Sequence, residues 1–213
     1  FSGSIYQLVY KEENLLQSPY PHIRTFGQNA VWYGGIHPYK LPDRENLLAS
    51  VMPDAYHQLN FRAQATESTG PDGQHWQGVA LYDETSCIKY LTKPSLPLLY
   101  INAQFENSGQ TKHSFDLVFH IFLRSLMGSR EKKTFYYERL GQVHKLTEAR
   151  KRRKVYSDDW GVVELGKNVF VTFFAPPEEN LEVAAYEWPA DGLQNVLLQK
   201  VCMEPKQIGI YQA

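Results

Sequence analysis

Two consecutive segments in which apolar and polar side chains alternate constrain the fold more than any other feature. In residues 98–105 the apolar side chains stand at the odd positions Leu99, Ile101, Ala103 and Phe105. In residues 113–123 they again stand at odd positions, from Phe115 to Leu123, with Val118 and Phe122 as exceptions on the other parity. Because side chains of a strand alternate between its faces, both segments predict strands with one apolar face.

The link between these two strands is polar and carries residues that favour a reversal of the chain. Residues 106–112 read Glu-Asn-Ser-Gly-Gln-Thr-Lys, and Asn and Gly accept the positive φ of a tight turn. The sequence therefore predicts an antiparallel hairpin, half-buried in a core built from sheets.

Short strands with turn residues between them are predicted along most of the chain, at spacings near 8–12 residues. Thr69–Gly73 is a strong turn signal, and Gly166–Asn168 separates two strands of a second hairpin. The segment 193–203 fits a strand or a short helix, and the unusual run Tyr33–Tyr39 suggests a shaped loop that could serve binding. The other predicted strands are 4–10, 59–65, 76–82, 86–91, 161–165, 169–174, 181–188 and 207–211.

These patterns favour a mainly β chain, and an aromatic content of 14% agrees with sheet packing. At 213 residues, the sequence predicts one domain over 1–213, an antiparallel β-sandwich of immunoglobulin-like or jelly-roll-like type. One or two short helices are expected, at Asp43–Ala49 and at Thr147–Lys154, where Thr147 would cap the first turn. The second lies in a basic helical or loop excursion at about 124–160.

The compartment is predicted from a few absences in the sequence. The two cysteines, Cys87 and Cys202, do not make a disulfide framework, and two buried free thiols are favoured over a bridge. No Asn-x-Ser/Thr sequon occurs, no apolar run approaches the roughly 20 residues of a membrane span, and the first residues lack the pattern of a signal peptide. We therefore expect an intracellular protein, with a nuclear location as one possibility.

The charge of the chain is distributed unevenly. Between Arg124 and Lys154 lie 11 of the 22 basic residues and 3 of the 23 acidic ones, a local balance of +8. The rest of the chain holds 11 basic and 20 acidic residues, a balance of −9. Lysine and arginine neutralise phosphates, and aromatic rings can stack on bases, so the segment 124–154 is a candidate site for nucleic acid or another polyanion. The residues predicted to bind are Arg130, Lys132, Lys133, Arg150, Lys151, Arg152, Arg153 and Lys154.

Three other interpretations of the basic residues stay open. The run Ala149–Lys154 resembles a short nuclear-import signal, which needs no folded surface. It also fits a solvated helix face, or cations that neutralise acidic neighbours such as Asp158–Asp159 or Glu178–Glu179.

No pattern of residues predicts a metal, a cofactor or a catalytic centre. The seven histidines show no His-x-His spacing, and His113 and His120 lie on opposite faces of one predicted strand. Asp54 near His57, or Asp83–Glu84 after a strand, would be catalytic carboxylates only if the fold gathered distant partners, and exposed turn acids are the simpler interpretation. The tryptophans Trp32, Trp76, Trp160 and Trp188 would either line a groove or lie in the core.

The sequence therefore favours a non-enzymatic module that binds nucleic acid or another polyanion through residues 124–154. The alternative is a protein-interaction or assembly module, as in a scaffold or viral structural protein, which uses sheet edges or aromatic surface. An enzyme whose site is assembled from scattered residues is a third possibility, and a deep pocket with convergent polar groups would favour it.

Overall fold

The computed structural model describes residues 4–17, 20–22, 31–41, 61–126, 132–174, 181–188 and 192–212. Every named element in these ranges is a β-strand, so the chain is mainly β, as predicted. All the strand pairs are antiparallel.

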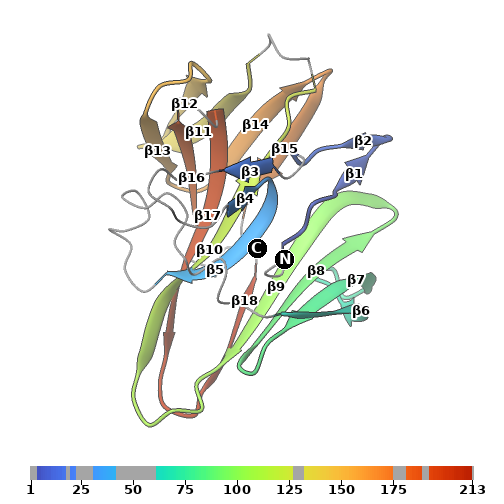
Figure 1. The fold of residues 1–213 in the computed structure, drawn as a ribbon, viewed down its shortest axis with the longest axis vertical. Coiled ribbons are helices and arrows are strands. Elements are labelled where there is room, and N and C mark those ends of the chain that lie inside the picture. Colours follow the sequence, from blue (N-terminus) through green and yellow to red (C-terminus); the bar gives the residue numbers. More distant parts are fainter. Residues whose placement is uncertain are drawn as a thin grey trace.

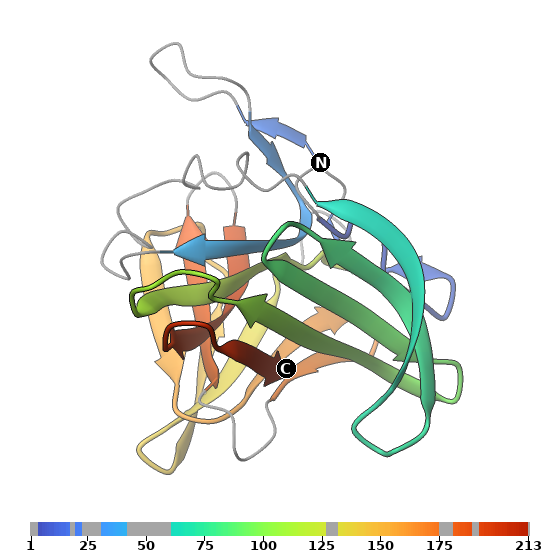
Figure 2. The ribbon, with the colours of Figure 1, turned by 90° about the horizontal axis from the view of Figure 1, so that it is seen from below.

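Three larger sheets carry most of the strands (Figure 1). The central sheet has the order β13-β16-β17-β10-β5, with strands Arg153–Ser157, Leu181–Trp188, Gly192–Met203, His113–Phe122 and Gly35–Leu41. The curved sheet has the order β18-β9-β8-β7-β6, with strands Ile208–Gln212, Leu96–Glu106, Ser86–Lys93, His75–Tyr82 and Arg62–Thr69 (Figure 2). The small sheet has the order β12-β11-β14-β15, with strands Gln142–Thr147, Thr134–Arg139, Gly161–Gly166 and Val169–Phe173. Two short pairs of strands lie outside these sheets: β1 (Val9–Tyr10) pairs with β2 (Glu13–Asn14), and β3 (Tyr20–His22) pairs with β4 (Val31–Tyr33).

The prediction of a hairpin at residues 98–123 is correct for its strands and wrong for their pairing. β9 pairs with β8 and β18 in the curved sheet, whereas β10 pairs with β17 and β5 in the central sheet. The apolar odd-numbered faces of β9 and β10 meet in the core, where the rings of Phe105 and Phe115 lie 5.1 Å apart, edge to face. Burying both apolar faces against each other outweighs the local preference of the link for a hairpin.

Two chain crossings between the central and curved sheets lie together at the lower end of Figure 1: the link 107–112 and the link 204–207. The buried Asn107 holds them. Its amide nitrogen donates to the carbonyls of Thr111, Met203 and Glu204, and its backbone N–H donates to Gln207. One side chain thus satisfies backbone acceptors from both links and holds the two links together.

The main core lies between the inward faces of the three larger sheets. Its completely buried members include Phe119 of the central sheet, Ile88 of the curved sheet, and Phe135 and Val163 of the small sheet. The opposite face of the central sheet is also buried, around Val118, Phe122 and Leu198 among others. The two exceptions to the alternation of β10, Val118 and Phe122, are therefore the sequence signal of a strand buried on both faces.

The predicted strands around Thr69–Gly73 and Gly166–Asn168 are confirmed as the β6–β7 and β14–β15 hairpins, and 193–203 is strand β17. The helix predicted at Thr147–Lys154 is wrong. Thr147 ends β12, Arg153 begins β13, and Arg150 has a φ of 53°, a left-handed conformation that a right-handed helix does not allow. The helix predicted at Asp43–Ala49 lies outside the described residues.

The shaped loop predicted at Tyr33–Tyr39 is mostly strand β5. Pro38 lies within it, because β5 is an edge strand, where a residue without an N–H is tolerated.

Candidate polyanion-binding site

The basic run at residues 152–154 is divided between two faces of the central sheet because β13 is a strand. Arg153 lies opposite Glu187 in the register with β16, and its side chain points to that carboxylate. Arg152 and Lys154 have the other parity and contact aromatic rings on the opposite face. Consecutive cations in the sequence therefore do not form one continuous patch.

The completely buried carboxylate of Glu187 organises the loop that precedes β13. It accepts hydrogen bonds from the backbone N–H groups of Ala149 and Lys151, and from Nε (2.7 Å) and Nη2 of Arg153. Arg153 Nη2 also donates to the carbonyl of Thr147 at 2.6 Å. Burial alone would raise the pKa of Glu187, but these donors outweigh it and lower the pKa below its ordinary value.

A second acid, Glu148, joins the two clusters of cations. Its backbone N–H donates to the carbonyl of Lys133, and its carboxylate accepts from the backbone N–H groups of Lys133 and Leu193. The segment that contains Lys132 therefore lies beside the start of the loop 148–152. The structure brings together residues that are about 18 positions apart in the sequence.

Lys133 does not contribute to the exposed positive surface. It is 5% exposed, and its Nζ donates to the carbonyls of Leu123 (2.8 Å) and Leu193 (2.5 Å). Burial lowers the pKa of Lys133 to about 8, and the nearby charge of Glu148 partly opposes this shift. Lys133 thus links the end of β10 to the start of β17 from inside the protein.

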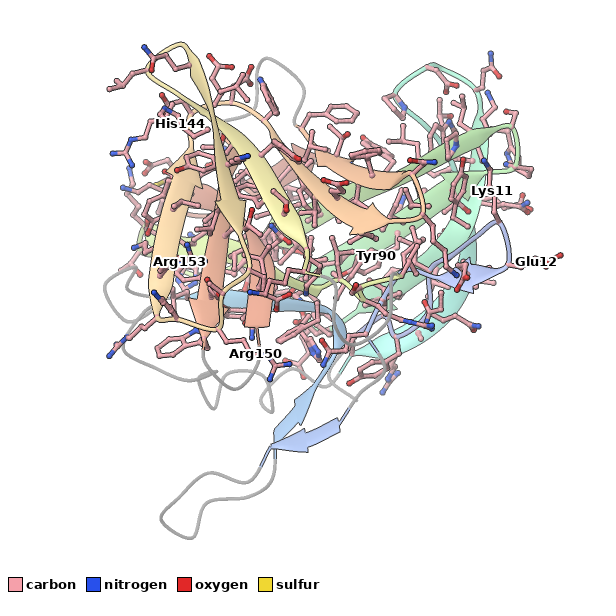
Figure 3. The ribbon with its side chains drawn as sticks, turned by 90° about the horizontal axis from the view of Figure 1, so that it is seen from above. Lys11, Glu12, Tyr90, His144, Arg150 and Arg153 are labelled. Atoms are coloured by element: carbon pink, nitrogen blue, oxygen red, sulfur yellow. The ribbon has the colours of Figure 1, made fainter. Side chains whose placement is uncertain are left out.

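Four of the predicted cations are exposed: Lys132, Arg150, Lys151 and Arg152. In the described part of the chain none of the four forms an ion pair. Figure 3 shows Arg150 and Arg153 near the same end of β13, with His144 farther away along the β11–β12 hairpin. Lys154 is half-buried, and Arg130 lies outside the described residues.

Aromatic rings lie beneath two of the cations. The guanidinium carbon of Arg152 is 4.8 Å from the ring centroid of Trp188, which is partly exposed. Lys154 Nζ is 4.2 Å from the ring centroid of Tyr156 and 5.7 Å from that of Tyr186. These are distances at which a cation is attracted to the face of a ring.

The other tryptophans differ in their roles. Trp76 is 1% exposed and belongs to a small core with Leu91 and Tyr100, and Trp160 donates its indole N–H to Glu138 at 2.8 Å. The side chain of Trp32 is outside the described residues.

The candidate catalytic carboxylate of Asp83 takes part in hydrogen bonds that have a structural role. It accepts from the backbone N–H of Thr85 and the hydroxyl of Ser86, and Lys40 Nζ donates to the same hydroxyl at 3.0 Å. This relay links strand β5 of the central sheet to the β7–β8 turn. Asp54 and His57 lie outside the described residues.

A group of polar side chains on a largely buried face of the central sheet was missed by the sequence reasoning. His37 of β5 and His120 of β10 are direct cross-strand neighbours. His120 donates from Nε2 to Gln194 (2.6 Å), and the Ser4 hydroxyl donates to Nδ1 of His37 (2.6 Å). Burial lowers the pKa of His37 to about 4 and that of His120 to about 3, so both are uncharged at neutral pH. The apolar exceptions Val118 and Phe122 were the signal that His120 would lie on a largely buried face of β10.

No group of three or more His, Cys, Asp or Glu side chains in the described ranges is arranged to hold a metal ion. Cys87 and Cys202 are both free, as predicted, but neither is buried: Cys87 is partly exposed and Cys202 is exposed. Nor does any helix in the described ranges have the length and apolar character to cross a membrane.

Comparison with models of protein families, and with curated proteins, gave no match. Among solved structures, a TPR-domain containing protein from Parabacteroides distasonis ATCC 8503 is similar, with a TM-score of 0.62 and 9% identity. The match covers 99% of this chain and 43% of that one, so this chain spans less than half the length of that protein. The Slr1438 protein from Synechocystis sp. PCC 6803 is similar at a TM-score of 0.50 and 11% identity, over 100% of this chain and 89% of that one. At these identities the likeness concerns the fold alone.

Proposed function

We propose that this chain is a non-enzymatic module that binds nucleic acid, or another polyanion, through the exposed cations of the loop 148–152 and the adjacent Lys132. One observation carries the proposal. Glu148 and Glu187, the acids that contact this loop, turn inward onto backbone N–H groups and Arg153, and the side chains of Lys132, Arg150, Lys151 and Arg152 are left facing solvent without ion pairs in the described part of the chain.

The scaffold that we infer is an antiparallel β-sandwich. The curved and central sheets share one apolar core, and the rings of Tyr90 and Phe119 meet across it at 6.3 Å. The two links held by Asn107 connect the same pair of sheets. A body of this kind presents its loops in fixed positions, which lowers the ordering cost of binding.

The expected contacts are mainly to phosphates, because exposed lysine and arginine side chains release counterions from a polyanion. If all four cations engage, the logarithm of the affinity should fall with the logarithm of salt concentration with a slope of roughly −3 to −4.

The test is elution of the purified chain from heparin and from DNA resin in a salt gradient. We expect the triple variant Arg150→Glu, Lys151→Glu, Arg152→Glu to elute at much lower salt than the unchanged protein. The matched control is Arg62→Glu, Lys200→Glu, Lys206→Glu, which changes the net charge equally at exposed positions elsewhere. If the first variant elutes with the unchanged protein, or both variants shift equally, this function is refuted. Thermal unfolding checks that each variant is folded.

A second function, a protein-interaction module, is favoured by the edge strand β12. Its neighbouring turn exposes Leu140 (88%), and the strand itself exposes Val143 (65%). In this case the basic run serves as a nuclear-import signal or a solvated face, and the protein is intracellular. Light scattering of the unchanged chain and of Val143→Lys, together with the location of a fluorescent fusion and its triple variant, distinguishes this function from the first.

A further inference from the structure

Cations and aromatic rings form successive pairs along one face of β13 and β16. Arg152 lies over Trp188, and Lys154, which is paired with Tyr186 in the strand register, lies over Tyr186 and Tyr156. We call these five residues the cation–aromatic ladder. On the other face of the same two strands, Arg153 and Glu187 neutralise each other.

The spacing of the ladder differs from the spacing of bases in a duplex. Trp188 is level with residue 152 in the strand register and Tyr156 lies four residues farther along β13, so the two rings are about 13 Å apart along the strand, whereas stacked bases of a duplex rise about 3.4 Å per nucleotide along each strand. A base can stack on either ring only when it is unpaired and separated from its neighbours, and a duplex does not allow this.

The exposure of the aromatic rings indicates which of them a base could contact. Trp188 and Tyr156 are partly exposed, whereas Tyr186 is 4% exposed beneath Lys154. Arg152 and Lys154 lie over the Trp188 and Tyr156 rings, so a base stacks there by displacing these two cations, which are then available to phosphates. Stacking on aromatic rings combined with cations along the backbone is the general way in which proteins bind single strands.

We propose that the partner of this site is single-stranded nucleic acid, with bases stacked on Trp188 and Tyr156 and phosphates bound by Arg150, Lys151 and Arg152. This inference rests on the function proposed above and adds the class of nucleic acid.

The experiment measures fluorescence anisotropy of the full chain with a labelled 15-nucleotide oligo(dT), with the same strand in a duplex, and with labelled heparin, each over a range of salt concentrations. We expect the single strand to bind at least tenfold more tightly than the duplex. Trp188→Leu should weaken single-strand binding about tenfold and leave the salt slope and heparin binding unchanged, because a stacking surface is lost without any charge. Trp188→Phe should restore most of the affinity. The matched control is Phe170→Leu, at an aromatic side chain that is 54% exposed on β15.

The outcomes separate the two proposals. Equal affinity for single strand and duplex, or an unchanged affinity in Trp188→Leu, overturns the single-strand proposal, and polyanion binding stands if the triple charge variant abolishes heparin binding. Loss of heparin binding in Trp188→Leu also overturns it, since stacking cannot explain that loss. If the triple charge variant binds all three probes normally, both proposals fail.

Discussion

The central sheet encloses titratable side chains in two regions. The side chain in one region is charged, and those in the other are neutral. At the β13–β16 margin, Glu187 is a charged carboxylate that is completely buried and has the Arg153 guanidinium and two backbone N–H groups as partners. Between β5 and β10, the buried His37 and the partly buried His120 are uncharged, and each has a neutral hydrogen-bond partner.

The difference shows what burial requires. A charge is retained in an interior only where partners replace the water that it loses, and a group whose burial is not compensated in this way becomes neutral instead. The first arrangement fixes a surface loop, and the second makes the sheet sensitive to acid. Four predictions test this contrast.

The largest effect is expected from acid acting on the histidines. Unfolded histidine binds a proton below pH 6.5, whereas folded His37 and His120 do so only near pH 4 and pH 3. Stability is therefore lost as the pH falls below 6.5, by on the order of 5 kcal/mol between pH 7 and pH 4.5 for the two groups. Urea unfolding at several pH values measures this loss. His37→Gln should remove about half of it, and His144→Gln, at an exposed histidine, should leave it unchanged; equal pH profiles for the two variants would contradict the assignment.

Removing the buried carboxylate is expected to have the next largest effect. Glu187→Ala leaves the Arg153 guanidinium and two backbone N–H groups without their acceptor, which should cost about 4 kcal/mol of unfolding free energy. Glu84→Ala, at an exposed acid, serves as the control and should change the stability by less than about 0.5 kcal/mol. Chemical denaturation at pH 7 gives both unfolding free energies. If both variants lose a similarly small amount, Glu187 does not hold the β13–β16 margin.

Exchanging the cation while keeping its charge should have a smaller effect. Arg153→Lys retains attraction to Glu187 but loses the two-pronged guanidinium contact and the bond to Thr147, at about 1.5 kcal/mol. The same exchange at the exposed Arg62 should be nearly neutral. A stability equal to that of the unchanged protein would mean that charge alone, without geometry, holds the loop.

The smallest effect is expected at Lys133, where the cost of burying an amine offsets its two bonds to carbonyls. Lys133→Met should stay within about 1 kcal/mol of the unchanged protein at pH 7. Because the pKa of Lys133 is lowered to about 8, the folded state releases its proton before the unfolded state does, and stability should rise from pH 8 to pH 10 through this group. Thermal unfolding at several pH values should show this rise disappearing in Lys133→Met and persisting in Lys132→Met. If the stability of both variants changes with pH in the same way, the pKa of Lys133 is not lowered.

Local patterns were enough to predict most strands and the mainly β character of the chain. The alternation in residues 98–105 and 113–122, and the turn chemistry at Thr69–Gly73 and Gly166–Asn168, identified real strands. The same patterns predicted the wrong partner for β10, because an apolar face indicates that a strand is buried and does not indicate which sheet buries it. The helix at Thr147–Lys154 failed for a related reason: pairing with β16 and the bonds of Glu187 to the loop outweighed the helix propensity of the run, which tertiary contacts readily override.

The sequence predicted the segment that carries the candidate site, but the structure determined which of its side chains are exposed. The sequence by itself determined that positive charge concentrates between Arg124 and Lys154, because charge is a property of composition. Only the tertiary structure decided that Lys133 and Arg153 turn inward while Arg150, Lys151 and Arg152 stay outside. The physical reason is that a strand sends neighbouring side chains to opposite faces, and Glu187, which accepts Arg153 on one of those faces, is 34 residues away in the sequence.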